Sequence, residues 1–158
     1  MFESAPRSSW GRTSAFDAFK SPSFLRITVS RTFTHEVEVQ FRDLDTRAHV
    51  NHVVYAAYFE RAKERLFEEV LGVSLSEAST FVRALDVEYR KPIAADETVA
   101  VDIGPVSVGE SSIRLEYELR VDGEGVATGH TVSVYVDDEE RPARVPDGWR
   151  DALAPYGE

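Results

Sequence analysis

One segment of this chain has the spacing of a long helix, and several segments beside it have the alternation of strands. Apolar residues recur at intervals of four, three, four and four from Tyr55 through Phe59, Ala62 and Leu66 to Val70. This period predicts an amphipathic helix over about residues 52–70, and Gly72 is a typical terminator just beyond it. A single helix cannot cover both faces of a sheet, so the sheet must wrap around it or gain cover from another subunit.

Five segments alternate apolar and polar side chains with a period of two, which predicts strands with one buried face. Gly104-Pro105 is expected to end the third, and Asp122-Gly123 is a strong signal for a tight hairpin turn after the fourth. The strands are expected within residues 34–41, 85–89, 99–103, 113–121 and 126–136. The chain is therefore predicted to be an α+β protein with a five-stranded antiparallel sheet around one central helix.

The length of 158 residues suits one domain with a real core. We expect the domain to span residues 33–145, between an irregular Ser- and Arg-containing extension at 1–32 and a tail at 146–158 that runs over the surface and ends in a short helical turn. The chain has no cysteine, which excludes disulfides, thiolate zinc sites and a cysteine nucleophile.

The formal net charge of -10 argues against nucleic acid or an anionic membrane as a partner. No apolar run is long enough to span a membrane, and we expect a cytoplasmic protein. Lysine is rare among the 18 basic residues, being found only at Lys20, Lys63 and Lys91. An acidic, lysine-poor chain suits a halophile with a salt-rich cytoplasm, and a GC-rich genome that favours arginine codons explains the same bias.

Polar residues able to do chemistry gather between the first strand and the helix. No other stretch mixes carboxylate, imidazole and amide so closely; the residues are Asp43, Asp45, His49, Asn51, His52, Tyr55 and Glu60. A helix start offers free N–H groups, and a carboxylate facing such donors can hydrolyse an activated carbonyl. The alternative is structural, with Asp45 capping the loop and the histidines lying on the surface.

A metal site and a serine nucleophile are both disfavoured. Asp45, His49 and His52 could supply three ligands, but they lack the i, i+4 histidine spacing with an adjacent Glu that helical zinc sites use. No Gly-x-Ser-x-Gly elbow occurs in the chain. We therefore expect neither a metal nor another cofactor.

Residues 39–55 read VQFRDLDTRAHVNHVVY. This string resembles the D-x-D-x-x-G-H-V-N-N-x-x-Y signature of hotdog-fold acyl-CoA thioesterases of the 4-hydroxybenzoyl-CoA thioesterase class. Residues 59–63 are similar to the step that follows in the family's helix. Weaker likenesses continue in order over residues 33–145, at Tyr89-Arg90-Lys91-Pro92, Asp96-Glu97-Thr98-Val99, Ser111-Ser112, Asp137-Asp138 and Arg141-Pro142.

The resemblance implies a hotdog fold that pairs into a homodimer or homotetramer, with sites between subunits. The second Asp of the signature falls on Asp45, which would act as nucleophile or general base on an acyl thioester. The backbone N–H of His52 would polarise the thioester carbonyl, while His49 and Asn51 would orient the loop or a water. Ala48 stands where the family has a glycine, and alanine tolerates a positive φ less well.

Substrate contacts are expected from both ends of the site. Tyr55 and Phe59 lie on the helix face toward the sheet, where they would line an acyl pocket or simply pack in the core. Arg90 and Lys91 would meet the phosphates of coenzyme A, or be an ordinary solvated strand end. An acyl carrier protein thioester is an alternative substrate. A non-catalytic acyl-CoA-binding module and an acyl-thioester hydratase or dehydratase are the other functions that this sequence leaves open.

Overall fold

A computed structural model describes residues 30–158 of the chain, so most of the predicted extension lies outside the described residues. The strands are β1 (Phe33–Glu38), β2 (Thr80–Tyr89), β3 (Thr98–Val108), β4 (Ser112–Val121) and β5 (Glu124–Tyr135). The helices are α2 (Val54–Leu66), α3 (Asp147–Leu153), a π-helical turn (Phe67–Leu71) and three 3₁₀ turns (Phe41–Asp43, Leu75–Glu77, Ala154–Tyr156).

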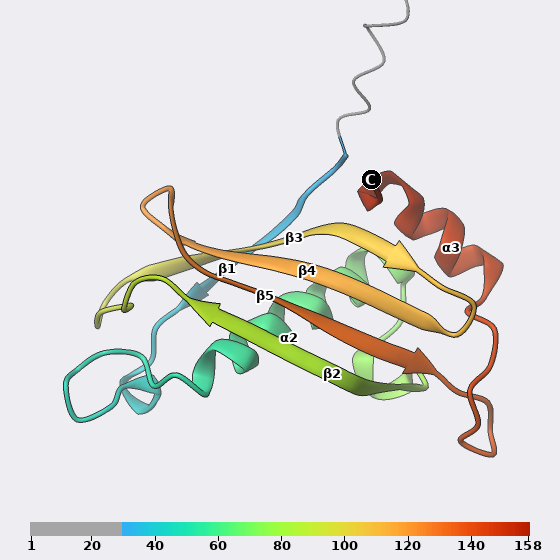
Figure 1. The fold of residues 1–158 in the computed structure, drawn as a ribbon, viewed down its shortest axis with the longest axis horizontal. Helices are drawn as coiled ribbons and strands as arrows, with labels where there is room; N and C mark the ends of the chain where they lie inside the picture. Colours follow the sequence, from blue (N-terminus) through green and yellow to red (C-terminus); the bar gives the residue numbers. More distant parts are fainter. Residues whose placement is uncertain (1–29) are drawn as a thin grey trace, which may run out of the picture.

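The five strands form one antiparallel sheet in the order β1-β3-β4-β5-β2. Figure 1 shows this sheet in front of α2, which runs along its other face. The predicted hotdog architecture, a five-stranded antiparallel sheet around one central helix, is therefore confirmed. No helix among residues 30–158 is long and apolar enough to cross a membrane.

The core lies between α2 and the face of the sheet that it covers. Alternate residues of β3 and β4 point into it, because successive strand side chains take opposite faces. Residues that are less than 2% exposed form its centre: Tyr58, Phe59, Leu66, Ile93, Val99, Val101, Ile103, Ile113, Leu115 and Leu119. This packing fixes α2, and with it the loop before α2, against the sheet.

Several predicted boundaries are wrong, and each has a local cause. β1 stops at Glu38, and Phe41 leaves the strand in a 3₁₀ turn with 92% of its surface exposed. β3 does not end at Gly104-Pro105, because an irregularity between Ile103 and Val106 lets the strand resume its pairing with β4. β2 begins at Thr80, five residues before the predicted start.

The end of the central helix and the C-terminal tail also differ from what the sequence predicts. α2 passes into the π-helical turn, and Gly72 ends it with a left-handed φ of 69°, as its position in the sequence predicts. In the tail predicted to run over the surface, Leu153 is part of the core. Trp149 of α3 packs edge-on against Phe67. The last residues therefore close the end of the core beside the π-helical turn.

Candidate active site

The loop between β1 and α2 begins with a buried carboxylate. Asp43 is 6% exposed, and its Oδ2 accepts hydrogen bonds from the backbone N–H of Gln40 at 2.8 Å and from Tyr58 Oη at 2.9 Å. Burial, and then this bond to Asp43, raise the pKa of Tyr58. The Asp43 carbonyl also accepts the N–H of Asn51 at 2.8 Å. Asp43 thus ties both ends of the loop to the middle of α2.

Asp45 lies on the other side of the same loop and is exposed. Its Oδ1 accepts the backbone N–H groups of Arg47 at 2.8 Å and His49 at 3.2 Å. These two bonds lower the pKa of Asp45 below its ordinary value, because they favour the charged form. The two acids of the D-x-D pair therefore have different surroundings, and only Asp45 is an ionised group open to a ligand.

The turn that carries Asp45 requires a left-handed residue. The Asp45 N–H donates to the His49 carbonyl at 2.7 Å, and the Ala48 N–H donates back to the Asp45 carbonyl at 3.1 Å. Ala48 closes this turn with a φ of 58°. The position where the family signature has a glycine thus has a positive φ, and alanine holds it at some cost in conformational energy.

The start of α2 is organised by Asn51. Its side-chain Oδ1 accepts the N–H of Val53 at 3.1 Å, and its carbonyl accepts the N–H of Val54 at 2.9 Å. Within residues 30–158 no hydrogen bond is formed by the N–H of His52. Asn51 therefore occupies two of the donors at the helix start and leaves the His52 N–H to a ligand.

Tyr89, at the end of β2, is a site residue that the sequence reasoning missed. Its Oη donates to the His52 carbonyl at 2.6 Å, and its ring packs edge-on against Tyr55 at 4.8 Å between centroids. Tyr89 thereby joins the last residue of an edge strand to the start of α2. The only signal in the sequence was its place in the Tyr-Arg-Lys-Pro string, which says nothing of this contact.

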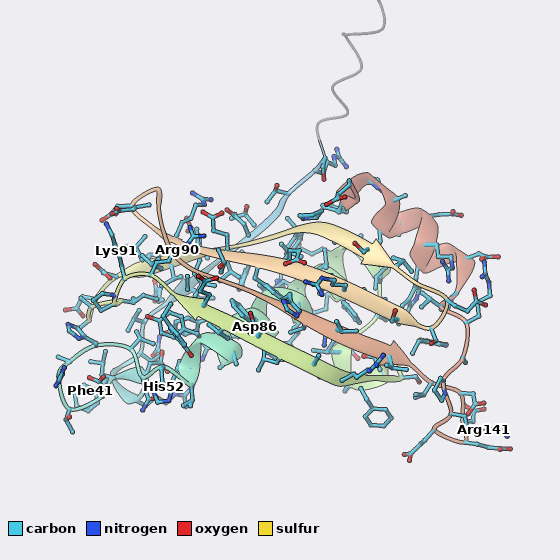
Figure 2. All side chains as sticks on the ribbon, viewed as in Figure 1. Phe41, His52, Asp86, Arg90, Lys91 and Arg141 are labelled. Carbon is cyan, nitrogen blue, oxygen red and sulfur yellow. The ribbon has the colours of Figure 1, made fainter. Side chains whose placement is uncertain are left out.

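These elements border an open cavity of about 330 Å³. Figure 2 shows His52, Arg90 and Lys91 at the same end of the molecule, where the loop and the end of β2 meet. The cavity is lined by Asp45, His49, Val50, His52, Tyr55, Tyr89, Arg90, Lys91 and Pro92. Six of the eight predicted site residues thus come together, although Arg90 and Lys91 are about forty positions away from the loop in the sequence.

The two predicted cations have different partners. Lys91 forms an ion pair with Glu124, and both side chains are more than half exposed. Arg90 is exposed, and its backbone N–H donates to the carbonyl of Val126 at 2.9 Å. Both cations stand at the mouth of the cavity, where a negatively charged ligand would meet them.

Phe59 and Asn51 do not line the cavity. Phe59 is fully buried and stacks on Tyr117 with ring centroids 4.3 Å apart, so the core-packing alternative describes it. Asn51 instead accepts hydrogen bonds from backbone N–H groups at the start of α2. Glu60 is exposed on α2 and lies 3.9 Å from the ammonium of Lys63, outside the cavity.

A larger hollow of about 500 Å³ lies on the opposite face of the sheet. Its charged side chains are mainly carboxylates, from Asp86, Glu88, Glu116, Glu118 and Glu158. Such a surface repels an anionic ligand. None of its lining residues comes from the loop between β1 and α2. Across the described residues, no group of three His, Asp or Glu side chains is arranged to hold a metal ion.

The fold agrees with that of similar proteins. A sequence model described as the Thioesterase-like superfamily matches residues 39–153, which include the loop, α2, the whole sheet after β1 and α3. The chain belongs to this superfamily.

Proteins of known structure share this fold. A thioesterase from Thermus thermophilus, solved in complex with coenzyme A and Zn, is 35% identical and has a TM-score of 0.73 over 79% of this chain and 94% of that one. A 1,4-dihydroxy-2-naphthoyl-CoA thioesterase from Synechocystis shares the fold at 17% identity, with a TM-score of 0.69 over 78% of this chain and 96% of its own.

The uncharacterized protein YsmA of Bacillus subtilis (strain 168) is 27% identical over 128 residues. These residues are 80% of this chain and 87% of that protein. The family match and the Thermus thioesterase support thioester hydrolysis as the general activity of this chain.

Proposed function

We propose that this chain hydrolyses an acyl-CoA thioester to the free acid and coenzyme A, with Asp45 as the catalytic carboxylate. The observation that carries the proposal is the position of Asp45, exposed in a cavity and held ionised by two backbone N–H groups. A carboxylate that stays charged at neutral pH can attack a thioester carbonyl or take a proton from water.

Two routes use the same residue. As a general base, Asp45 removes a proton from water while the water oxygen attacks the carbonyl carbon, and the thiolate of coenzyme A then leaves and is protonated. As a nucleophile, Asp45 forms a mixed anhydride as the thiolate leaves, and water hydrolyses the anhydride. Both routes place negative charge on the carbonyl oxygen in the transition state.

The N–H of His52 is proposed to stabilise that charge. It lies at the start of α2, where the helix dipole favours an anion, and Asn51 has taken the neighbouring N–H groups. An oxyanion donor of this kind is typically worth about 2.7–4 kcal/mol of barrier. His49 lines the same cavity, where we propose that it orients a water or the thioester.

Coenzyme A is proposed to bind at the mouth of the cavity, with Arg90 and Lys91 meeting its phosphates. The Thermus protein in complex with coenzyme A, at 35% identity, supports this choice of carrier. An acyl carrier protein would present the same thioester and phosphate, so a comparison of the two thioesters decides between them.

The test is release of free thiol from a panel of acyl-CoA esters. Asp45→Asn keeps the shape of the side chain but removes its charge, so kcat should fall by about 10²-fold or more, while the melting temperature and substrate affinity stay nearly unchanged. Glu60→Gln is the matched control, because Glu60 is an exposed carboxylate outside the cavity. Activity that survives Asp45→Asn but is lost in Glu60→Gln would place the chemistry elsewhere, and binding of coenzyme A without thiol release would indicate a binding module.

We also propose that the chain is at least a dimer that pairs through β2. This ten-residue strand lies at the edge of the sheet and pairs only with β5 among the described residues. Its apolar side chains stay exposed, with Phe81 at 54%, Val82 and Leu85 at 50% and Tyr89 at 47%. An open edge with exposed apolar side chains invites pairing with a second copy. Light scattering should then give at least twice the chain mass of 17.7 kDa, and a monomer at micromolar concentration would refute the proposal.

A further inference from the structure

The acyl end of the proposed site has a floor made of two tyrosines. Tyr55 of α2 is 3% exposed, and Tyr89 of β2 packs edge-on against it. Both line the cavity that contains Asp45, together with Val50 and Pro92. With its thioester at Asp45 and its phosphates at Arg90 and Lys91, a substrate would direct its acyl group toward these side chains.

The next layer of the molecule lies one helical turn farther along α2. Phe59 follows Tyr55 by four residues, so the two side chains share one face of the helix. On the sheet, Tyr89 pairs with Ala127, and two residues away along each strand Val87 pairs with Gly129. Gly129 also pairs with Tyr117 of β4. Phe59, Gly129 and Tyr117 thus form the layer directly behind the tyrosine floor.

This layer is filled by side chains and leaves no opening behind the tyrosine floor. Phe59 is 0% exposed and stacks on Tyr117 at 4.3 Å with an interplanar angle of 11°. Its ring also lies over Gly129, where an added Cβ would be 2.6 Å from Cε2 and 2.8 Å from Cζ. The ring and the backbone carbonyl of Asp86 together use the space that a side chain at 129 would take. No room is left between the helix and the sheet for an extended alkyl chain at this level.

We infer that this enzyme acts on short or compact acyl groups, and that Phe59 is the residue that sets the limit. The inference rests on the proposed hydrolysis of acyl-CoA and deepens it by naming the class of acyl group. The cavity volume of about 330 Å³ agrees, because it is near the lower end for small-molecule sites and must also admit the thioester. Short aliphatic acyl groups and a single aromatic ring fit such a space, and a long fatty acyl chain does not.

The experiment measures kcat/KM over acetyl-, butanoyl-, hexanoyl-, decanoyl-, dodecanoyl- and benzoyl-CoA, all below their micellar concentrations. The wild-type protein should lose at least about tenfold in kcat/KM between hexanoyl- and dodecanoyl-CoA, because the closed Phe59 layer excludes the added carbons and even one methylene in a hydrophobic site is worth about tenfold or more. Phe59→Ala should recover most of that loss. Phe59→Leu, which removes less of the core, should recover part of it and serves if the alanine variant does not fold.

Leu66→Ala is the matched control. Leu66 is also fully buried on α2 but lies about two turns beyond Phe59, away from the cavity. Its truncation loosens the core in the same way and should leave the chain-length profile unchanged. The same esters are titrated by calorimetry onto Asp45→Asn, so that binding is measured without turnover.

Three results would overturn the inference: dodecanoyl-CoA used as well as hexanoyl-CoA by the wild-type protein, a wild-type profile in both folded Phe59 variants, or a Leu66→Ala profile that shifts like that of Phe59→Ala. Failure of the proposed function has a different signature, namely no thiol released from any ester. In that case the same calorimetric titration, made with the wild-type protein, still reports whether long acyl groups are excluded.

Discussion

The two ends of α2 are built from the same kind of amphipathic pattern and have opposite surroundings. At its start, His52 is exposed, Asn51 occupies backbone donors, and a cavity opens beside Asp45. At its other end Leu66 and Phe67 are fully buried, and Trp149 of α3 covers Phe67. The first end keeps polar groups available to a ligand, whereas the second is filled with side chains.

The difference shows how one helix can serve both stability and chemistry. The buried end holds α2 on the sheet, so the exposed end can leave an N–H without a protein partner and still keep its position. Even the charged group near the buried end is enclosed: Lys63 donates to Ser133 Oγ at 3.1 Å, and burial lowers the pKa of this lysine. Changes at the buried end should therefore alter stability, and changes at the start of α2 should alter activity.

The largest effect is expected at the buried end. Phe67→Ala removes a fully buried ring from between Trp149 and the core, and should lower the free energy of unfolding by about 3–5 kcal/mol. Urea denaturation followed by circular dichroism measures this loss. The kcat of the molecules that remain folded should match the wild type, and a folded but inactive variant would show that the two ends are not separate.

A smaller effect is expected where β2 meets the helix start. Tyr89→Phe removes the hydroxyl that donates to the His52 carbonyl but keeps the ring against Tyr55. The free energy of unfolding should fall by about 0.5–1.5 kcal/mol, the usual net value of one hydrogen bond. Because His52 is less well held, kcat should fall as well. An unchanged kcat would mean that the loop keeps His52 in place without Tyr89.

The loop itself offers a gain in stability. Ala48→Gly relieves a left-handed residue with a φ of 58°, but it also raises the entropy of the unfolded chain. The net result should be a gain of about 0.5–1 kcal/mol in thermal or chemical unfolding, with kcat close to the wild type. A loss of stability would mean that the alanine methyl group makes contacts that outweigh the backbone cost.

The pH dependence of kcat/KM tests whether Asp45, beside the start of α2, is the catalytic group. Asp45 works as a carboxylate, and the N–H groups of Arg47 and His49 lower its pKa below the ordinary value of about 3.8. Activity is lost as the pH falls through this lowered pKa, so the acid limb of kcat/KM should lie below pH 3.8 wherever the protein is still folded. Circular dichroism at each pH separates this limb from unfolding. A limb near the ordinary histidine pKa of about 6.5 would point to a histidine instead.

The order of the elements could be predicted from the sequence because their patterns are local. The three- and four-residue spacing from Tyr55 to Val70, the alternation in residues 113–121 and the Asp122-Gly123 turn each depend on near neighbours. The ends of strands are predicted less well from local patterns, because they depend on pairing and on contacts with distant residues. Pairing with β4 carries β3 past Gly104-Pro105, and the 3₁₀ turn that Asp43 caps takes Phe41 out of β1.

The candidate site divides in the same way. The sequence by itself placed Asp45, His49 and His52 together, because they lie within eight positions of one another before a helix. Only the tertiary structure decided that Tyr89 holds His52 and that Arg90 and Lys91 reach the same cavity, because sheet pairing brings β2 back to the loop. Likewise, Tyr55 and Phe59 are equivalent in the helical pattern, and they differ because the stack of Phe59 on Tyr117 over Gly129 is a contact among three separate elements.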